Sequence, residues 1–360
     1  MKVGIVGMPG VGKSALFRAL THGSAAQEAH GGKGAISTGV VRVPDQRFDW
    51  LVDHHKSKKA TPATVEFVDG APSVGEDPRK FTSEFFTHIR SVDALLHLVR
   101  AFDSEMLGAP SPISDLQRVQ DELALSDLQM VETRVEKLDK HLKATKAGAV
   151  TAQTIERDLM HDIRDWLEAE KPLSTFQFTP DQIKIVTGFE FLTLKPAMVV
   201  ANVSENDVGG ESSPETEQLR THCNANGLPF EAVCAKLEAE IAELPEAEQA
   251  EYLQAMGLAH PARETIIMEA YRATGVITFF TSADPEVRAW TIPAGSHAIE
   301  AAEKIHTDIA RGFIRAEVVP FETVKAAGSW DAAKHQGKVE LHMKDYIVRD
   351  GDIIYIRFKV

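Results

Sequence analysis

The sequence predicts an α/β protein whose main domain holds a mostly parallel sheet, with a helical insertion and a small α+β domain at the end. Three observations lead to this organisation. Short apolar runs alternate with helical patterns along much of the chain. A coiled-coil-like stripe crosses its middle, and short strands with turn signals follow Gly275.

The strands of the main domain are predicted from short apolar runs. They are Val3–Val6, Val65–Val68, Ala94–Val99, Ala197–Ala201 and, as a further candidate, Pro229–Val233. Helical patterns lie between them, and near-continuous apolar strands are typical of a parallel sheet covered on both faces. We therefore assign residues 1–112 and 193–275 to one α/β domain.

Residues 113–192 follow a different pattern. Apolar side chains recur at alternating spacings of three and four, at Leu128, Val131, Val135, Leu138 and Leu142. This spacing is typical of a coiled-coil seam, and a second helical stripe follows the turn signal at 147–149. The pattern predicts an antiparallel coiled-coil hairpin inserted into the main domain, and two separate surface helices are the alternative.

Residues 276–360 are predicted to form a small separate α+β domain. Its strands are expected at Glu286–Ile292, Gly312–Val319, Tyr346–Val348 and Ile353–Phe358. Asp350-Gly351-Asp352 between the last two is a hairpin-type turn signal.

Composition excludes several classes of protein. The formal net charge is -14, so the chain as a whole is not a basic nucleic-acid binder. Its two cysteines exclude a disulfide framework and fit a reducing compartment. No window reaches the roughly 18 apolar residues that span a bilayer, and the N-terminus lacks a signal-peptide core. We expect a cytoplasmic protein with no membrane partner.

The most specific motif is Gly7–Ser14, which matches G-x-x-x-x-G-K-S between a predicted strand and a predicted helix. Backbone N–H groups of such a P-loop and the helix N-terminus bind the phosphates of a nucleotide. Lys13 is expected to reach the β- and γ-phosphates, and the Ser14 hydroxyl to bind Mg²⁺. The predicted nucleotide contacts of the loop are Pro9, Gly10, Val11, Gly12, Lys13, Ser14 and Ala15.

Asp69 is the second candidate magnesium ligand. It ends the strand Val65–Val68, and a carboxylate at the carboxyl edge of a central strand suits a metal-bound water beside the P-loop. The alternative is an ordinary strand-end aspartate that opens a turn.

Two segments are candidates for reading the base. Asn202-Val203-Ser204-Glu205 follows a strand where Ras-like domains read N-K-x-D, whose Asp accepts two guanine donors. Glu205 is one methylene longer and misplaced for that contact, which favours ATP and leaves GTP as the alternative. The second segment is Cys234, Ala235 and Lys236, whose backbone amides are expected to touch the ring.

Together these segments resemble the YchF-type Obg-like ATPases, a TRAFAC family of P-loop NTPases. Matching stretches are Gly4–Leu20, Thr38–Val41, Val65–Asp69, Leu123–Leu125, Val200–Val203, Glu238–Leu244, Val287–Pro293, His306–Asp308, Arg311–Val318 and Lys344–Val348. The resemblance implies a Ras-like G domain, a helical hairpin insertion and a C-terminal TGS domain of β-grasp type. It also implies ATP binding, slow Mg²⁺-dependent hydrolysis and association with ribosomal particles.

The chain departs from the family's pattern where the γ-phosphate is sensed. Near Gly32-Lys33-Gly34 there is no hydroxyl in place of the family's switch threonine, and Pro72 replaces a switch glycine. Proline has no N–H to donate to a phosphate. Gly10 stands where the family carries Asn. The resemblance also implies no counterpart of the glutamine that orients water in Ras, so no catalytic side chain is assigned. We expect a slow ATPase switch, with a GTPase or a non-hydrolysing scaffold as alternatives, and the oligomeric state stays unassigned.

Overall fold

The computed structural model describes residues 1–21, 27–28, 37–69, 81–144, 152–208, 212–256, 258, 260–283 and 286–359. The chain forms two compact units. The P-loop unit comprises Met1–Val40 and Glu66–Ile266, and the C-terminal unit comprises Val41–Val65 and Ile267–Val360. In the described part of the chain, none of the helices combines the length and apolar character that crossing a bilayer requires.

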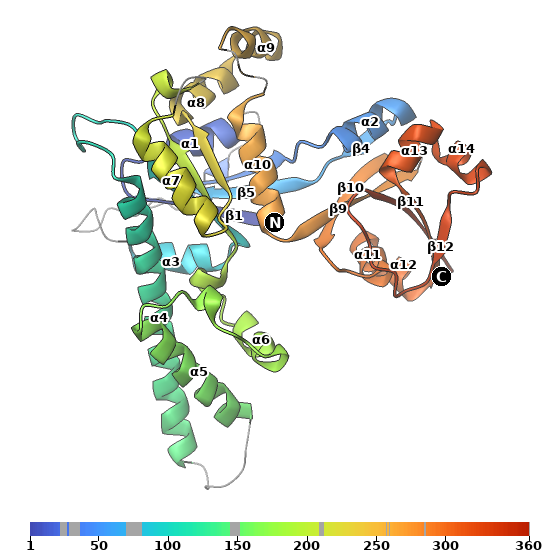
Figure 1. The fold of residues 1–360 in the computed structure, drawn as a ribbon. Helices are drawn as coiled ribbons and strands as arrows, with labels where there is room; N and C mark the ends of the chain where they lie inside the picture. The colour runs from blue at the N-terminus through green and yellow to red at the C-terminus, as the bar shows by residue number, and fades with distance from the viewer. Residues whose placement is uncertain are drawn as a thin grey trace. The chain divides into compact units, whose positions relative to one another are not determined.

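A seven-stranded sheet organises the P-loop unit (Figure 1). Its strands, in spatial order, are β2 (Gln27–Glu28), β3 (Ser37–Arg42), β5 (Thr64–Asp69), β1 (Lys2–Val6), β6 (Ala94–Arg100), β7 (Ala197–Asn202) and β8 (Phe230–Val233). From β5 to β8 each neighbouring pair is parallel, as the apolar runs predict. The carboxyl ends of β1, β5 and β7 therefore meet at one edge, which brings the P-loop, Asp69 and Asn202 together.

The helical segments of this unit connect the strands. Outside the insertion they are α1 (Lys13–Thr21), α3 (Ser83–Arg90), η3 (Glu205–Asp207), α7 (Pro214–Ala225), α8 (Ala235–Glu243) and α9 (Glu246–Ala255). The helix α10 (Ala262–Ala273) begins in this unit and continues into the C-terminal unit after Ile266. The insertion holds α4 (Pro112–Ala144), α5 (Ala152–Glu168), η1 (Leu173–Thr175), α6 (Pro180–Thr187) and η2 (Leu192–Leu194).

The insertion is an antiparallel helical hairpin, as the apolar spacing predicts. Figure 1 shows α4 and α5 side by side. Val131, Val135 and Leu138 of α4 share one buried cluster with Leu159 and Ile163 of α5. The two helices thus bury a common seam, which excludes the alternative of two separate surface helices. The turn signal at 147–149 lies outside the described residues.

A buried carboxylate fixes the base of this hairpin. Asp127 of α4 is fully buried and accepts a hydrogen bond of 2.6 Å from Arg90 Nη1 at the end of α3. It also accepts hydrogen bonds from the backbone N–H groups of Leu192 and Thr193 and from the Thr193 hydroxyl. Three segments of the chain that lie far apart in sequence are thereby joined at one side chain.

The C-terminal unit holds a six-stranded mixed sheet. In spatial order its strands are β12 (Glu340–His342), β11 (Phe313–Pro320), β13 (Asp352–Phe358), β9 (Val276–Ala283), β10 (Glu286–Pro293) and β4 (Lys59–Thr61). Its helices are α2 (Gln46–His55), α11 (Ala298–Ile305), α12 (Thr307–Arg311), α13 (Phe321–Ala327) and α14 (Trp330–His335). The central strands β13 and β9 are parallel, and β11 and β10 flank them antiparallel. This α+β arrangement fits the β-grasp domain that the resemblance implies.

The structure corrects the predicted domain boundary at residues 41–65. Sequence order places them in the main domain, between the P-loop and Asp69, yet they pack with the C-terminal unit. The reason is strand pairing, because β4 lies parallel to β10, and Glu286 of β10 accepts from the Thr61 hydroxyl at 2.7 Å. An ion pair of 2.6 Å between Arg47 of α2 and Asp350 adds to this attachment.

The predicted strand Tyr346–Val348 and its hairpin with β13 are also wrong. Asp352 is buried and accepts hydrogen bonds from the Tyr346 hydroxyl at 2.8 Å and from the Arg349 N–H at 2.9 Å. The Val348 N–H donates to the Ser296 carbonyl, and the Ala298 N–H donates to the Tyr346 carbonyl, which forms an isolated antiparallel bridge between His297 and Ile347 and not a strand paired with β13. An edge strand of the sheet, β12, pairs with β11, and β13 pairs with β11 and β9.

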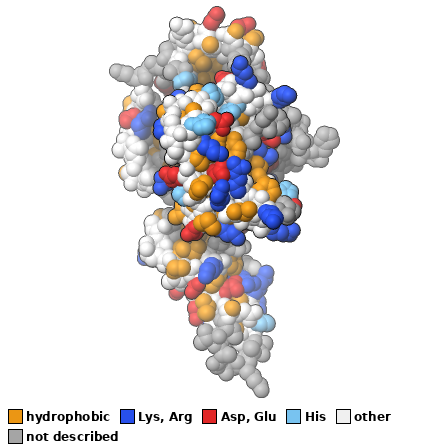
Figure 2. Space-filling model, turned by 90° about the vertical axis from the view of Figure 1, so that its right-hand side faces the viewer, with side chains coloured by type: hydrophobic (Ala, Val, Ile, Leu, Met, Phe, Trp, Pro, Cys, Tyr) orange, Lys and Arg blue, Asp and Glu red, His pale blue; other side chains and the backbone are white. Residues whose placement is uncertain are grey.

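The surface of the C-terminal unit exposes several large apolar side chains. They are Ile314, Leu341, Met343, Ile347 and Phe358. Figure 2 shows Lys and Arg side chains among hydrophobic ones on the face of this unit that it presents. A mixture of cationic and apolar side chains is common where proteins meet partners.

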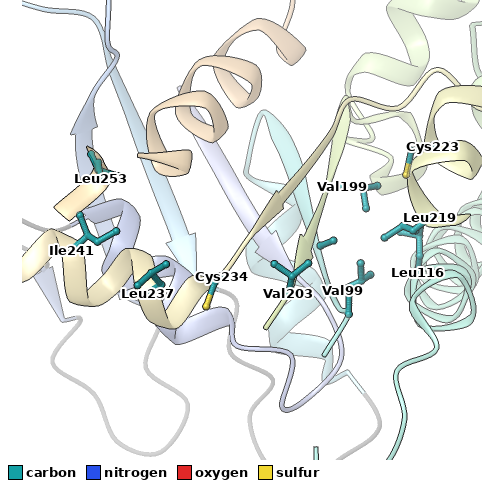
Figure 3. Close-up of a cluster of buried hydrophobic side chains, with 12 residues drawn as sticks. Val99, Leu116, Val199, Val203, Leu219, Cys223, Cys234, Leu237, Ile241 and Leu253 are labelled. Carbon is teal, nitrogen blue, oxygen red and sulfur yellow. The ribbon is translucent and has the colours of Figure 1, made fainter. Parts of the chain in front are cut away.

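An apolar cluster supports the strands that carry the base-side loops (Figure 3). In that view Leu116, Leu219 and Cys223 lie to one side of the strands, and Leu237 and Ile241 of α8 lie to the other. Cys223 and Cys234 are both buried and both free. The ends of β7 and β8 are thus held between helices on both sides.

The buried His97 on β6 makes stability depend on pH. Burial lowers its pKa from 6.5 to about 4, and its Nδ1 has no hydrogen-bond partner among the described residues. The folded state keeps this imidazole neutral, so the unfolded chain binds the extra proton between pH 6.5 and pH 4. We expect this residue to lower the free energy of unfolding by up to about 1.4 kcal/mol per pH unit as pH falls through that window, roughly 3 kcal/mol in all.

The measurement is urea unfolding of the wild type and of His97→Gln at several pH values between 7 and 4. The other titrating groups are common to both proteins, so the difference between their pH slopes isolates the histidine. Equal slopes would show that His97 does not carry this dependence.

Candidate nucleotide-binding site

The P-loop connects β1 to α1 through two glycines in backbone conformations that other residues rarely adopt. Gly10 has φ of 80° and Gly12 has φ of 97°. A Cβ atom on Gly7 would lie 2.3 Å from the Leu98 carbonyl oxygen, and one on Gly12 would lie 2.4 Å from Asn202 Nδ2. The glycines of the motif are therefore required by close packing as well as by the turn.

Lys13 lies at the centre of the loop. Its side chain is largely buried, and Nζ donates to the carbonyls of Gly7 at 2.9 Å and Met8 at 3.0 Å. Burial lowers the pKa of this ammonium to about 8, against the opposing effect of the Asp69 carboxylate. A phosphate would supply the negative charge that favours the protonated form.

Ser14 and Asp69 lie together, as the sequence predicts for two magnesium ligands. The Ser14 hydroxyl donates to Asp69 Oδ2 at 3.1 Å. Burial raises the pKa of Asp69, while the Ser14 hydrogen bond and Lys13 oppose that change. Asp69 Oδ1 is buried without a hydrogen-bond partner in the described part of the chain. An unpartnered carboxylate oxygen beside a hydroxyl fits a hard cation with oxygen ligands.

The base-side asparagine joins three parts of the site. Asn202 Nδ2 donates to the Val11 carbonyl at 2.8 Å, and Asn202 Oδ1 accepts from the Ala235 N–H at 2.9 Å. The structure thus brings both predicted base-side segments against the P-loop. Within the P-loop itself, the Ala15 N–H donates to the Gly12 carbonyl in the first turn of α1.

The other residues that the sequence predicts to contact the base lie near Asn202. Val203 is buried, and Cys234 is a buried residue at the start of α8. Glu205 is partly exposed at the start of η3, and its Oε1 accepts from Lys236 Nζ at 2.7 Å. Pro9 lies at the half-exposed outer side of the loop.

The switch segments that the sequence singles out, around Gly32-Lys33-Gly34 and Pro72, lie outside the described residues.

Sequence reasoning missed Arg100, which shapes the loop beside the P-loop. This arginine is buried at the end of β6, and its guanidinium donates to the carbonyls of Phe102, Gly108 and Ala109. The loop approaches Gly10, where a Cβ would lie 2.8 Å from Leu107 Cδ1. A larger residue at position 10 would displace Leu107. An arginine closing an apolar strand was the available signal.

Comparisons with known proteins agree with this geometry. A family profile described as a 50S ribosome-binding GTPase matches residues 2–145, and the YchF GTPase C-terminal profile, described as a protein of unknown function, matches residues 276–359. The chain is 38% identical to the ribosome-binding ATPase YchF of Bacillus subtilis, over the full length of both. The chain belongs to the YchF family of Obg-like ATPases.

Other YchF relatives and a solved structure cover the same span. Human Obg-like ATPase 1 is 34% identical, with 99% of this chain and 92% of that protein aligned. The structure of the Schizosaccharomyces pombe YchF GTPase matches with a TM-score of 0.86 at 29% identity, covering 99% of this chain and 97% of that one. The predicted family and fold class are thereby confirmed. The names disagree on the nucleotide, because the relatives are called ATPases and the solved protein a GTPase.

Proposed function

We propose that the protein binds ATP with Mg²⁺ through the P-loop and hydrolyses it slowly as a ribosome-associated switch. The observation that carries this proposal is the cluster of Lys13, Ser14 and Asp69 at the carboxyl edge of the sheet. It supplies one buried ammonium for the phosphates and two side chains with oxygen ligands for a cation, and Asp69 Oδ1 is buried with no hydrogen-bond partner among the residues that the structure describes.

Each residue has a separate task in this proposal. Lys13 exchanges its carbonyl partners in the loop for the β- and γ-phosphates, while backbone N–H groups around Gly12 line the phosphate path. Ser14 and Asp69 would hold Mg²⁺, which when bound neutralises phosphate charge. Asn202 positions the base side by fixing the P-loop against α8.

The preference for adenine rests on Glu205. In N-K-x-D sites a shorter aspartate accepts two hydrogen bonds from guanine, and a site that binds those donors discriminates strongly against bases lacking them. Glu205 carries an extra methylene, and Val203 stands in place of the lysine. We therefore expect a weaker guanine contact than an aspartate would make, so that ATP is the preferred nucleotide.

Titration calorimetry with ATP and GTP, each with Mg²⁺, tests this preference. The expected result is tighter binding of ATP. Tighter binding of GTP would overturn the assignment of Glu205 while leaving the phosphate site in place, and that outcome would favour the GTPase alternative.

A non-hydrolysing scaffold is the second candidate, favoured by the missing switch threonine and by Pro72. Each lost donor to developing charge costs roughly 10²- to 10³-fold in rate. Steady-state phosphate release by the wild type decides between the two. Release that exceeds the Lys13→Ala background supports the slow ATPase, and release equal to that background supports the scaffold.

Association with the ribosome is proposed from the relatives' names and from the surface of the C-terminal unit. The chain is acidic overall, but residues 311–359 carry nine Lys and Arg against seven Asp and Glu. Figure 2 shows Lys and Arg side chains among hydrophobic ones on the face of this unit that it presents. Co-sedimentation with ribosomal subunits at increasing salt is the test, because phosphate contacts weaken steeply with salt. A protein that stays in the supernatant even at low salt would contradict it.

A further inference from the structure

An ion pair joins the two base-side loops. Lys236 Nζ lies 2.7 Å from Glu205 Oε1, whereas its distance to Glu240 Oε1 is 3.9 Å. Glu205 is thus the main partner of this lysine. The hydrogen bond with Glu205 is also the largest cause that raises the pKa of the Lys236 ammonium.

The backbone on each side of this pair is held in place. Glu205 begins η3, where the Ser204 hydroxyl donates to Asp207 Oδ2 at 2.8 Å. Lys236 is the second residue of α8, directly after Ala235, whose N–H is bonded to Asn202. Both charged side chains therefore extend from fixed positions beside the asparagine that anchors the P-loop.

We propose that Lys236 is a specificity-determining positioning residue that holds Glu205 away from guanine. This inference rests on the proposed function, since it requires a purine beside Glu205. A carboxylate binds a pair of guanine donors best when both oxygens can face the base and its charge is not shared with a cation. Lys236 bonds Oε1 of Glu205 and shares its charge, so guanine meets a carboxylate that is drawn toward the lysine and is a weaker acceptor. Adenine does not present that pair of donors, so the ion pair weakens the binding of adenine less than it weakens the binding of guanine.

The size of the effect follows from one charge-assisted hydrogen bond. Both side chains are exposed, with 71% and 48% of them accessible, and solvent screening limits the effect of exposed pairs. We expect Lys236→Met, which keeps the aliphatic stem and the backbone amide, to shift the ratio of GTP to ATP affinity toward GTP by about threefold to fivefold.

The experiment is calorimetric titration of the full chain with Mg²⁺-ATP and Mg²⁺-GTP. Lys236→Arg retains a cation and is expected to keep the wild-type ratio, and Glu240→Gln, which changes the more distant neighbour, is the matched control. In a Glu205→Gln background Lys236→Met is expected to leave the ratio unmoved, because the lysine acts through that carboxylate. A variant that is partly unfolded would bind both nucleotides more weakly by the same factor, so the ratio of GTP to ATP affinity would not change.

The outcomes separate this inference from the proposed function. A wild type that binds neither nucleotide overturns both. Binding of both nucleotides with a ratio that Lys236→Met changes by less than about twofold overturns the assignment of Lys236 alone. A shift that persists in the Glu205→Gln background also overturns it, since the lysine would then act by another route.

Discussion

Replacing Lys13 by alanine is expected to weaken binding of Mg²⁺-ATP by at least about 100-fold. The Lys13 ammonium is buried among the loop carbonyls, and in the proposed site it would bring positive charge to the phosphates. Charge-assisted hydrogen bonds contribute about 1.5–3 kcal/mol each, and losing about 3 kcal/mol weakens affinity by roughly two orders of magnitude. Titration calorimetry with ATP measures the change directly.

Two comparisons make this result specific. Lys184→Ala removes an exposed lysine of α6 and is expected to leave ATP affinity unchanged. Circular dichroism of Lys13→Ala is expected to match the wild type, because the glycine turns do not depend on the ammonium. Affinity of Lys13→Ala within a few-fold of the wild type would disprove the phosphate assignment.

The second large effect is expected at the base of the hairpin. Asp127→Ala removes a fully buried carboxylate and leaves Arg90, whose side chain is 17% exposed, without its charge partner. The N–H groups of Leu192 and Thr193 lose their acceptor as well. Removing one partner of a buried ion pair costs about 3–5 kcal/mol, and we expect a loss of that size in the free energy of unfolding.

Urea unfolding followed by circular dichroism measures this loss, and hydrogen exchange in α4 and α5 locates it. Asp127→Asn keeps one acceptor oxygen and is expected to fall between the wild type and Asp127→Ala. Asp121→Ala, an exposed position on the same helix, is the matched control. If Asp127→Ala and Asp121→Ala unfold at the same urea concentration, the buried network does not stabilise the hairpin.

Local patterns predict much of this fold because their physical causes are local. The glycines and lysine of residues 7–14 specify a turn and a charge by themselves. The apolar runs of β1, β5, β6 and β7 mark strands that are buried on both faces. The three-and-four spacing from Leu128 to Leu142 predicts a helix with one apolar face, and α5 supplies the matching face.

The errors occur where a distant partner decides the structure. Nothing in Lys59–Thr61 indicates that this strand pairs with Glu286–Arg288, more than two hundred residues later. Tyr346–Val348 has strand-like composition, but its backbone bonds to the distant residues 296–298 in an isolated bridge and does not pair with β13. Both outcomes depend on contacts that a single sequence does not display.

The candidate site also combines residues that a local motif predicts with contacts that only the structure shows. The P-loop residues and Asp69 could be named from the motif and the end of a strand, and the structure brings Ser14 and Asp69 together. The pairing of Glu205 with Lys236 could not be predicted, because it joins loops 31 residues apart in the chain. For Arg100 the sequence shows an unusual arginine at the end of an apolar strand, but it does not show the backbone carbonyls to which this arginine donates.

The membership of residues 41–65 in the C-terminal unit has a consequence for how the two units are tethered. The chain passes between them three times, after Val40, after Val65 and after Ile266. Cutting the chain at Gly275 would not liberate an intact nucleotide-binding module, since Phe48 and Leu51 of α2 would lose the sheet that shields them from water.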